Sequence, residues 1–526
     1  MNTRIRLFLC LWIKRVTILL MGMVHTPVMA LPTVKQIAEY AKEKPQMQLL
    51  IVNELMGYIE PCGCTIDLKL GSIERLEALI RSTRAHIPTN ILTVGSHLFD
   101  HAELKEHSLA QERAKAKMIR TIMRNWPVDA HLDGALDTAA GEFFYDGLKN
   151  NIPLNELSDP TSSPQNHMKI IEKSGVKLGV IALRGSLNQE GQKSIITNAL
   201  SVMKTQAIHL KVVISTLKRA DLRSLAIAFP EVTLWILGSG AQEEMNLSPV
   251  EHTDITKKSY IVEAGDRGRH LAVIKLYGLK HLGPLNDTKG DRLREIKKLE
   301  LKVKMRRQFA SMSKSPFMQQ RVKRLEEQLE TLKNKPIPTH HKRIEYQLIP
   351  ITKDLPSSKA VAQVVDHYQE SLIALNMKTA SQVKPPPANG NGYAGVAECS
   401  LCHPAAEEFW KTTRHAKAWQ TLEKAKKTFD VGCVGCHVTG WQEPGGSALG
   451  HTKKLQDVQC EACHGPAAKH AEIGGGESYV KLKVPSEKCE TCHNHLHSPK
   501  FEYESYLSKI IGPGHGQPLP THPKSD

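Results

Sequence analysis

The motif C-x-x-C-H occurs four times after residue 398 of this 526-residue chain. Its two thiols can form thioether bonds to the vinyl groups of one haem, and its histidine can bind the iron. The motifs use eight of the eleven cysteines: Cys399 and Cys402, Cys433 and Cys436, Cys460 and Cys463, Cys489 and Cys492. The histidines that follow them are His403, His437, His464 and His493. We therefore expect four covalently bound haem c groups.

Zinc is the competing interpretation, because paired C-x-x-C motifs also build four-cysteine zinc sites. Zinc does not require a histidine after every second cysteine, and here that histidine is present each time. Haem also explains why the segment has little strand or helix pattern, since haems supply a core that so short a segment cannot build from side chains.

Four haems need up to four further iron ligands on the opposite side of each porphyrin. Histidine is the obvious donor, and the segment offers seven candidates besides the motif residues. They are His415, His451, His470, His495, His497, His515 and His522.

The first thirty residues have the pattern of a secretory signal peptide. They contain four basic and no acidic residues, an apolar run over Val16–Val24 and a small-residue ending at Val28-Met29-Ala30. The apolar stretches are too short to cross a bilayer, so no stable membrane span is expected after cleavage of residues 1–30. The mature protein is expected to be periplasmic or otherwise exported.

The formal net charge is +16. Removal of the leader leaves about +12, and the propionates of four haems would bring the charge to roughly +4. No nucleic-acid-binding motif accompanies the basic residues. A lysine-rich surface therefore favours acidic redox partner proteins over nucleic acid.

Residues 47–280 alternate apolar runs with helical stretches, which predicts an α/β domain. Continuous Val, Ile and Leu runs suit strands that are covered on both faces. The candidate strands are Gln48–Val52, Asn90–Val94, Lys177–Ala182, Leu210–Ser215, Val232–Leu237 and His270–Leu276.

Residues 285–382 are rich in charged residues and leucine and predict a helical, coiled-coil-like connector. Val322, Leu325, Leu329 and Leu332 follow a 3-4-3 spacing, and a break near Lys314-Ser315-Pro316 suggests a hairpin. A Pro/Gly linker at 383–392 then leads to a mainly α-helical multihaem cytochrome c domain at 393–526.

The C-terminal segment resembles the tetrahaem cytochrome c family typified by the electron acceptor of hydroxylamine oxidoreductase. The resemblance rests on Tyr393-Ala-Gly, Trp410-Lys-Thr-Thr-Arg-His415-Ala-Lys-Ala, Cys433-Val-Gly-Cys-His-Val-Thr-Gly440, Cys460-Glu-Ala-Cys-His-Gly-Pro466 and Ser498-Pro-Lys-Phe501.

This resemblance implies an assignment of the distal ligands. It pairs His415 with His464, His470 with His403, and His515 with His493, with His497 as the rival of His515. It also implies that the iron bound by His437 has no distal side chain and is five-coordinate.

Residues 47–276 resemble the metallophosphatase domain of the 5′-nucleotidase family, a sandwich of two sheets with a two-metal site. The segments that match the family's motifs are Asn53-Glu54-Leu55-Met56-Gly57, Val94-Gly95-Ser96, Gly134-Ala135-Leu136-Asp137, Ser215-Thr216-Leu217 and Gly238-Ser239-Gly240. The family's ligand positions are then Met56, Ser96, Ala135, Thr216 and Ser239, and only Glu54 and Asp137 keep a carboxylate. A methionine and an alanine cannot hold a hard cation, so phosphatase activity is expected to be absent.

Cys62 and Cys64 lie outside the haem motifs, in Glu60-Pro-Cys62-Gly-Cys64, a stretch that also recurs in phosphatase-like domains joined to multihaem cytochromes. The two thiols could form a reactive dithiol, a metal-ligand pair or a haem contact. A local disulfide or two buried thiols suits an oxidising compartment better than a catalytic role.

The favoured function is electron transfer through the four haems. The alternative is an oxidoreductase that acts on a small nitrogen or sulfur compound at a five-coordinate haem. A metallophosphatase with an attached cytochrome is the third hypothesis.

Overall fold

The computed structural model describes residues 44–60, 70–157, 167–238, 253–256, 259–279, 285, 288–313, 315–335, 342–379, 384–449, 453–476, 479–494, 498 and 500–515. Cys62, Cys64, Ser239, His451, His495, His497 and His522 lie outside these residues, as does the expected signal peptide.

One sheet of the N-terminal domain has five strands in the order β11-β10-β1-β2-β3. Strand β1 pairs in parallel with β2 and antiparallel with β10, and β3 extends the parallel side. The strands are β1 (Met47–Asn53), β2 (Thr89–Gly95), β3 (Val128–Asp133), β10 (His270–Tyr277) and β11 (Arg343–Pro350).

The other sheet has six strands in the order β4-β5-β6-β7-β9-β8. Its central strands β5, β6, β7 and β9 are parallel, and the two edges are antiparallel hairpins. The strands are β4 (Met168–Lys173), β5 (Val176–Leu183), β6 (Leu210–Ser215), β7 (Leu234–Leu237), β8 (Thr253–Thr256) and β9 (Ser259–Glu263).

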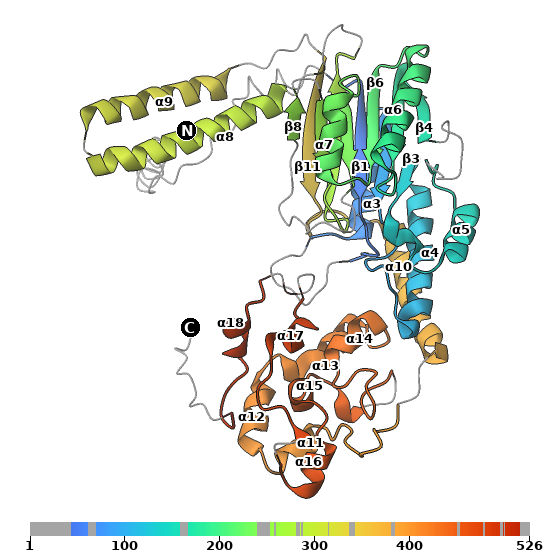
Figure 1. Cartoon of the computed structure of the whole chain (residues 1–526), viewed down its shortest axis with the longest axis vertical. Helices are drawn as coiled ribbons and strands as arrows, with labels where there is room; N and C mark the ends of the chain where they lie inside the picture. The colour runs from blue at the N-terminus through green and yellow to red at the C-terminus, as the bar shows by residue number, and fades with distance from the viewer. Residues whose placement is uncertain are drawn as a thin grey trace, which may run out of the picture. The chain divides into compact units, whose positions relative to one another are not determined.

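The two sheets pack face to face and are covered by helices, as Figure 1 shows. Alternate residues of both sheets, such as Leu49 and Val212, form the inner core, and the opposite residues pack against helices. One outer face is covered by α3 (Ile73–Thr83), α4 (Glu106–Asn125), α5 (Glu142–Asn151) and α10 (Lys359–Thr379), and the other by α6 (Gln189–Lys204) and α7 (Arg219–Ala228). The expected α/β sandwich is confirmed.

Part of the segment that was expected to be a helical connector belongs to this domain. Strand β11 pairs with β10 over its whole length, and α10 packs on α3 and α4. Only α8 (Thr288–Ser313) and α9 (Pro316–Asn334) form the helical hairpin that the sequence suggested. Val322 is buried in its seam, and Leu325, Leu329 and Leu332 are half-buried.

The C-terminal region is helical with little regular structure, as expected. Its elements are α11 (Val396–Ser400), α12 (Pro404–Thr412), η3 (His415–Lys417), α13 (Ala418–Ala425), α14 (Val431–His437), η4 (Lys453–Leu455), α15 (Cys460–His464), α16 (Ala468–Ile473), α17 (Ser486–Glu490) and α18 (Tyr503–Leu507). The described part of the chain has no helix that combines the length and the apolarity needed to cross a bilayer.

Candidate haem-binding region

Each C-x-x-C-H motif forms a short helical turn. Residues three apart share one side of a helix, so the two thiols of a motif face the same way. The backbone N–H groups of His403 and His493 donate to the carbonyls of Cys399 and Cys489 at 2.9 and 2.8 Å, which is the helical i to i−4 pattern. The turn therefore presents two thiols and one imidazole together.

Three of the motif histidines are oriented through the nitrogen that faces away from the expected iron. Nδ1 of His437 lies 2.5 Å from the Ala418 carbonyl, and Nδ1 of His464 lies 2.6 Å from the Lys481 carbonyl. Nδ1 of His493 lies 2.9 Å from the Ser498 hydroxyl. A hydrogen bond donated by Nδ1 fixes the ring tautomer and leaves Nε2 as a metal ligand.

Three pairs of histidine rings face each other at nearly equal distances. The ring centres are 6.3 Å apart for His403 and His470, 6.2 Å for His415 and His493, and 6.4 Å for His464 and His515. Two imidazoles that bind one metal from opposite sides, each with a bond of about 2 Å, have ring centres about 6 Å apart. The donor set and its spacing therefore fit six-coordinate haem irons.

Two of these pairs differ from the ones that the family resemblance implied. His415 lies opposite His493 rather than His464, and His515 lies opposite His464 rather than His493. His515 lies on the C-terminal tail of the described chain. The tail passes so close to α12 that a Cβ at Gly514 would lie 2.6 Å from Cβ of Ala406. His403 lies opposite His470, the histidine that the resemblance named as its partner.

The first, third and fourth motifs lie close together. The thiol groups of Cys399 and Cys460 lie close enough to interact, and this interaction lowers the pKa of Cys460 and raises that of Cys399. Burial raises the pKa of Cys463 to about 11, and the Cys489 thiol lies near enough to add to that shift. Haems attached at these motifs would therefore be neighbours.

The second motif is held by the α/β domain. Gln111 of α4 donates to the Asp430 carboxylate at 2.6 Å and accepts from the Val431 N–H at 3.1 Å. Asn376 of α10 donates to Gln111 at 2.7 Å and to the Phe429 carbonyl at 2.6 Å. Because Asp430 caps α14 and Val431 begins it, these contacts fix the start of the helix that carries Cys433, Cys436 and His437.

In the α/β domain, the two remaining carboxylates of the family's metal site bind backbone N–H groups. The Asp137 carboxylate accepts from His97 and Leu98 at 2.8 Å and from Gly134 at 3.1 Å. The Glu54 carboxylate accepts from Ser96 at 2.9 Å, and burial raises its pKa well above the usual value. These carboxylates serve local structure at the strand ends.

The backbone at this site is also unusual. Glu54 and Met56 have positive φ angles of 41° and 52°, and a Cβ at Gly95 would lie 1.9 Å from a carboxylate oxygen of Glu54. Left-handed conformations at ordinary residues are typical of functional loops. Among the described residues, no group of three or more His, Cys, Asp or Glu is arranged to hold a metal ion.

Two buried histidines near these carboxylates were not singled out from the sequence. Nδ1 of His97 lies 3.4 Å from the Leu55 N–H, and Nδ1 of His131 lies 2.8 Å from the Thr93 hydroxyl. Their rings are 5.4 Å apart, and burial lowers the pKa of both well below the usual value. The only local signal is that His97 lies three residues after the predicted strand Asn90–Val94 and directly follows Ser96.

Known proteins match the two parts of the chain separately. The family model "Cytochrome c554 and c-prime" matches residues 398–465. Cytochrome c-554 from Nitrosomonas europaea is 34% identical over 141 residues, which is 20% of this chain and 60% of that protein. The C-terminal part resembles cytochrome c554. This similarity supports a multihaem c-type cytochrome.

Solved 5′-nucleotidase structures resemble the fold of the N-terminal part. A 5′-nucleotidase precursor from Thermus thermophilus matches with a TM-score of 0.42 and 14% identity, over 65% of this chain and 61% of that chain. A putative 5′-nucleotidase from Staphylococcus aureus matches with a TM-score of 0.41 and 12% identity, over 72% of this chain and 66% of that chain. These are similarities of fold alone.

Proposed function

We propose that this protein is an exported cytochrome that carries electrons through four covalently bound haems. The observation that carries the proposal is the set of three facing histidine pairs, each of which contains one C-x-x-C-H histidine. Histidines that bind no metal would not be expected to face the motif histidines at the distance that a shared metal ion requires. Three such pairs at nearly equal spacing therefore favour haem iron between them.

In this proposal the eight motif cysteines anchor the porphyrins, and His403, His437, His464 and His493 are the proximal ligands. His470, His415 and His515 are the distal ligands of the first, fourth and third haems. The haems supply one-electron chemistry. Histidine on both sides keeps an iron closed to other ligands, which suits electron transfer.

The hydrogen bonds at Nδ1 of the motif histidines would also affect how these histidines bind iron. A carbonyl that accepts from Nδ1 makes the opposite nitrogen a better donor to iron and holds the ring in place. His437 and His464 have carbonyl acceptors, whereas His493 has the hydroxyl of Ser498, a weaker acceptor. The haem bound by His493 would therefore differ in reduction potential from those bound by His437 and His464.

The α/β domain is proposed to position the cytochrome rather than to hydrolyse phosphoesters. Its positions Met56 and Ala135 offer no ligand to a hard metal ion. Glu54 and Asp137 are buried and engaged by backbone N–H groups. Meanwhile α4 and α10 bind the start of the second haem motif through Gln111 and Asn376.

Intact-protein mass spectrometry of the mature chain, produced in cells that mature c-type cytochromes, tests the haem count. We expect about four haem masses above the polypeptide mass. Replacement of Cys433→Ser with Cys436→Ser should remove one haem mass, because it removes both thioether anchors of one haem. A colourless protein, or one with zinc or free thiols at these cysteines, would contradict the proposal.

A further inference from the structure

The far part of the α8–α9 hairpin, residues 301–325, has an unusual composition; we call it the hairpin tip. It contains eight Lys and Arg and no Asp or Glu. The helix pair from 288 to 335 carries a formal charge of +9, more than half of the +16 of the whole chain. The basic side chains of the tip whose surroundings are described all lie exposed: Lys302, Lys304, Arg306, Arg307, Arg321, Lys323 and Arg324.

The hairpin tip also exposes large apolar side chains. Leu301, Met305 and Phe309 of α8 are 57%, 50% and 61% exposed, and Phe317 at the start of α9 is 68% exposed. Residues four apart lie on one side of a helix, so the first three form a single stripe. A merely solvated hairpin would carry polar residues there.

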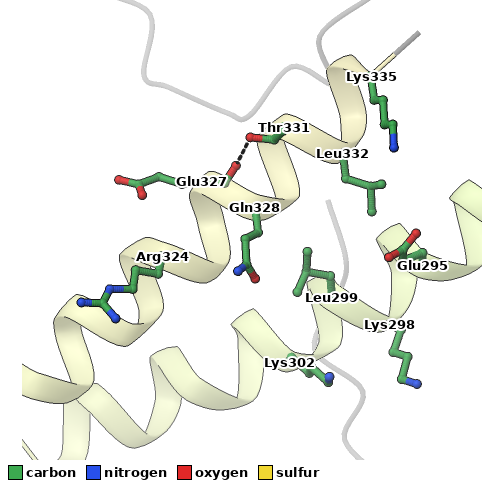
Figure 2. A pocket seen from close by; sticks show the side chains of 10 residues that line it. All are labelled: Glu295, Lys298, Leu299, Lys302, Arg324, Glu327, Gln328, Thr331, Leu332 and Lys335. Atoms are coloured by element: carbon green, nitrogen blue, oxygen red, sulfur yellow. Dashed lines mark hydrogen bonds between the residues drawn. The ribbon is translucent and has the colours of Figure 1, made fainter. Parts of the chain in front are cut away.

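This stripe is not the surface that holds the hairpin together. The seam between the helices uses Val303, Ala310 and Val322, which are buried. Nearer the base, Figure 2 shows Leu299 of α8 and Leu332 of α9 between the two helices. Helix α8 therefore has two apolar sides, one packed on α9 and one without a described covering element.

The tip lies far from the base of the hairpin. An α-helix rises about 1.5 Å per residue, so Ser313, the last residue of α8, lies roughly 30 Å along the helix from Arg292 near its base. Arg292 donates to the Lys335 carbonyl there, and α8 also contacts β11. The hairpin can therefore reach a surface that the rest of the domain does not touch.

We propose that the hairpin tip docks this protein reversibly on an anionic lipid surface. Leu301, Met305, Phe309 and Phe317 would enter the boundary between headgroups and acyl chains, and the surrounding Lys and Arg would contact the headgroups. No transmembrane span is needed for this mode of binding.

Two other occupants fit the tip less well. A specific protein interface buries roughly 800 Å² on each partner around a packed core, which four side chains on two thin helices do not provide. A second copy of the hairpin would bring the same strong positive charge and be repelled. A bilayer needs no shape complementarity, only an apolar boundary and negative charge.

Vesicle sedimentation with the mature, haem-loaded full chain tests this proposal. The vesicles are pure phosphatidylcholine, or phosphatidylcholine with roughly 30% phosphatidylglycerol. We expect at least about tenfold stronger binding to the anionic vesicles, and a marked loss of that binding at high salt, because screening weakens headgroup contacts. Equal binding to both vesicle types, or to neither, would overturn the proposal.

Variants separate tip docking from general attraction of a basic protein. Phe309→Ser with Phe317→Ser should weaken binding to anionic vesicles by about tenfold or more. Phe143→Ser is the matched control, because Phe143 is 94% exposed on α5 and lies outside the hairpin. The haem absorption spectrum and circular dichroism should be unchanged by all three substitutions, since the side chains are exposed.

A second pair of variants tests the charge. Lys304→Gln with Arg306→Gln should weaken binding by about tenfold, whereas Lys193→Gln with Lys204→Gln, an equal change of net charge on α6, should change it by less than about twofold. Equal effects of the two pairs would mean unlocalised electrostatic adsorption and would overturn the proposal. So would tip variants that leave vesicle binding intact but weaken binding to an acidic redox protein.

Discussion

Asp137 and Glu54 are carboxyl groups in a place that is unfavourable for a negative charge. Burial raises the pKa of Asp137 to about 7 even though three backbone N–H groups donate to it. Burial also dominates the upward shift of the pKa of Glu54. Both carboxyl groups are therefore costly to ionise, and backbone hydrogen bonds keep them in place.

These shifts predict a pH dependence of stability. A carboxyl whose folded pKa is raised binds its proton more tightly in the folded state, so its contribution is fully present below the unfolded pKa near 4. For Asp137 that contribution is lost as the pH rises toward the folded pKa of about 7, and for Glu54 it is lost as the pH rises through its own raised pKa. The free energy of unfolding of the α/β domain should therefore fall over this range, by up to about 1.4 kcal/mol per pH unit for each group. Denaturant unfolding at several pH values measures it, and Asp137→Asn should flatten the slope. A slope that is the same in Asp137→Asn would contradict the prediction.

At the level of elements, helix α14 is unusual because its first residues are capped from another part of the chain. Gln111 bonds both the Asp430 carboxylate and the Val431 N–H, and Gln111 and Asn376 are almost fully buried. An ion pair between Lys427 and Glu60 adds a second contact nearby. The position of the second haem motif thus depends on α4 and α10.

Gln111→Ala tests this dependence. It would leave buried donors and acceptors without partners, each at a cost of about 1–3 kcal/mol. We expect a lower free energy of unfolding and a shifted reduction potential of one haem out of four, because only α14 loses its support. Gln328→Ala, at an exposed position of α9, is the control. Spectroelectrochemistry that shows four unchanged potentials would count against the role of Gln111.

For the whole molecule, the predictable features were those encoded locally. The C-x-x-C-H motifs, the apolar strands and the break at Pro316 each depend on neighbouring residues, and their elements appear in the structure. Strand β11 was not predicted, because its sequence, Arg343–Pro350, mixes polar and apolar residues and its partner β10 lies across the whole hairpin. The partner of His515 depends on the path of the tail beside α12, and the partner of His415 depends on where η3 lies; no local pattern encodes either.

The exchanged histidine pairs predict how many haems of the reduced protein bind carbon monoxide, which binds only irons with an open coordination position. If His403, His464 and His493 share their irons with His470, His515 and His415, at most one haem in four binds it. His415→Ala should open one further iron, whereas His367→Ala, at an exposed position of α10, should open none. Absorption titration counts the haems that bind carbon monoxide.

The pairing of His415 with His493 is tested in protein that lacks the fourth haem, made by Cys489→Ser with Cys492→Ser. There His415→Ala should open no additional iron, because its partner haem is gone; one more open iron would instead assign His415 to the haem of His464.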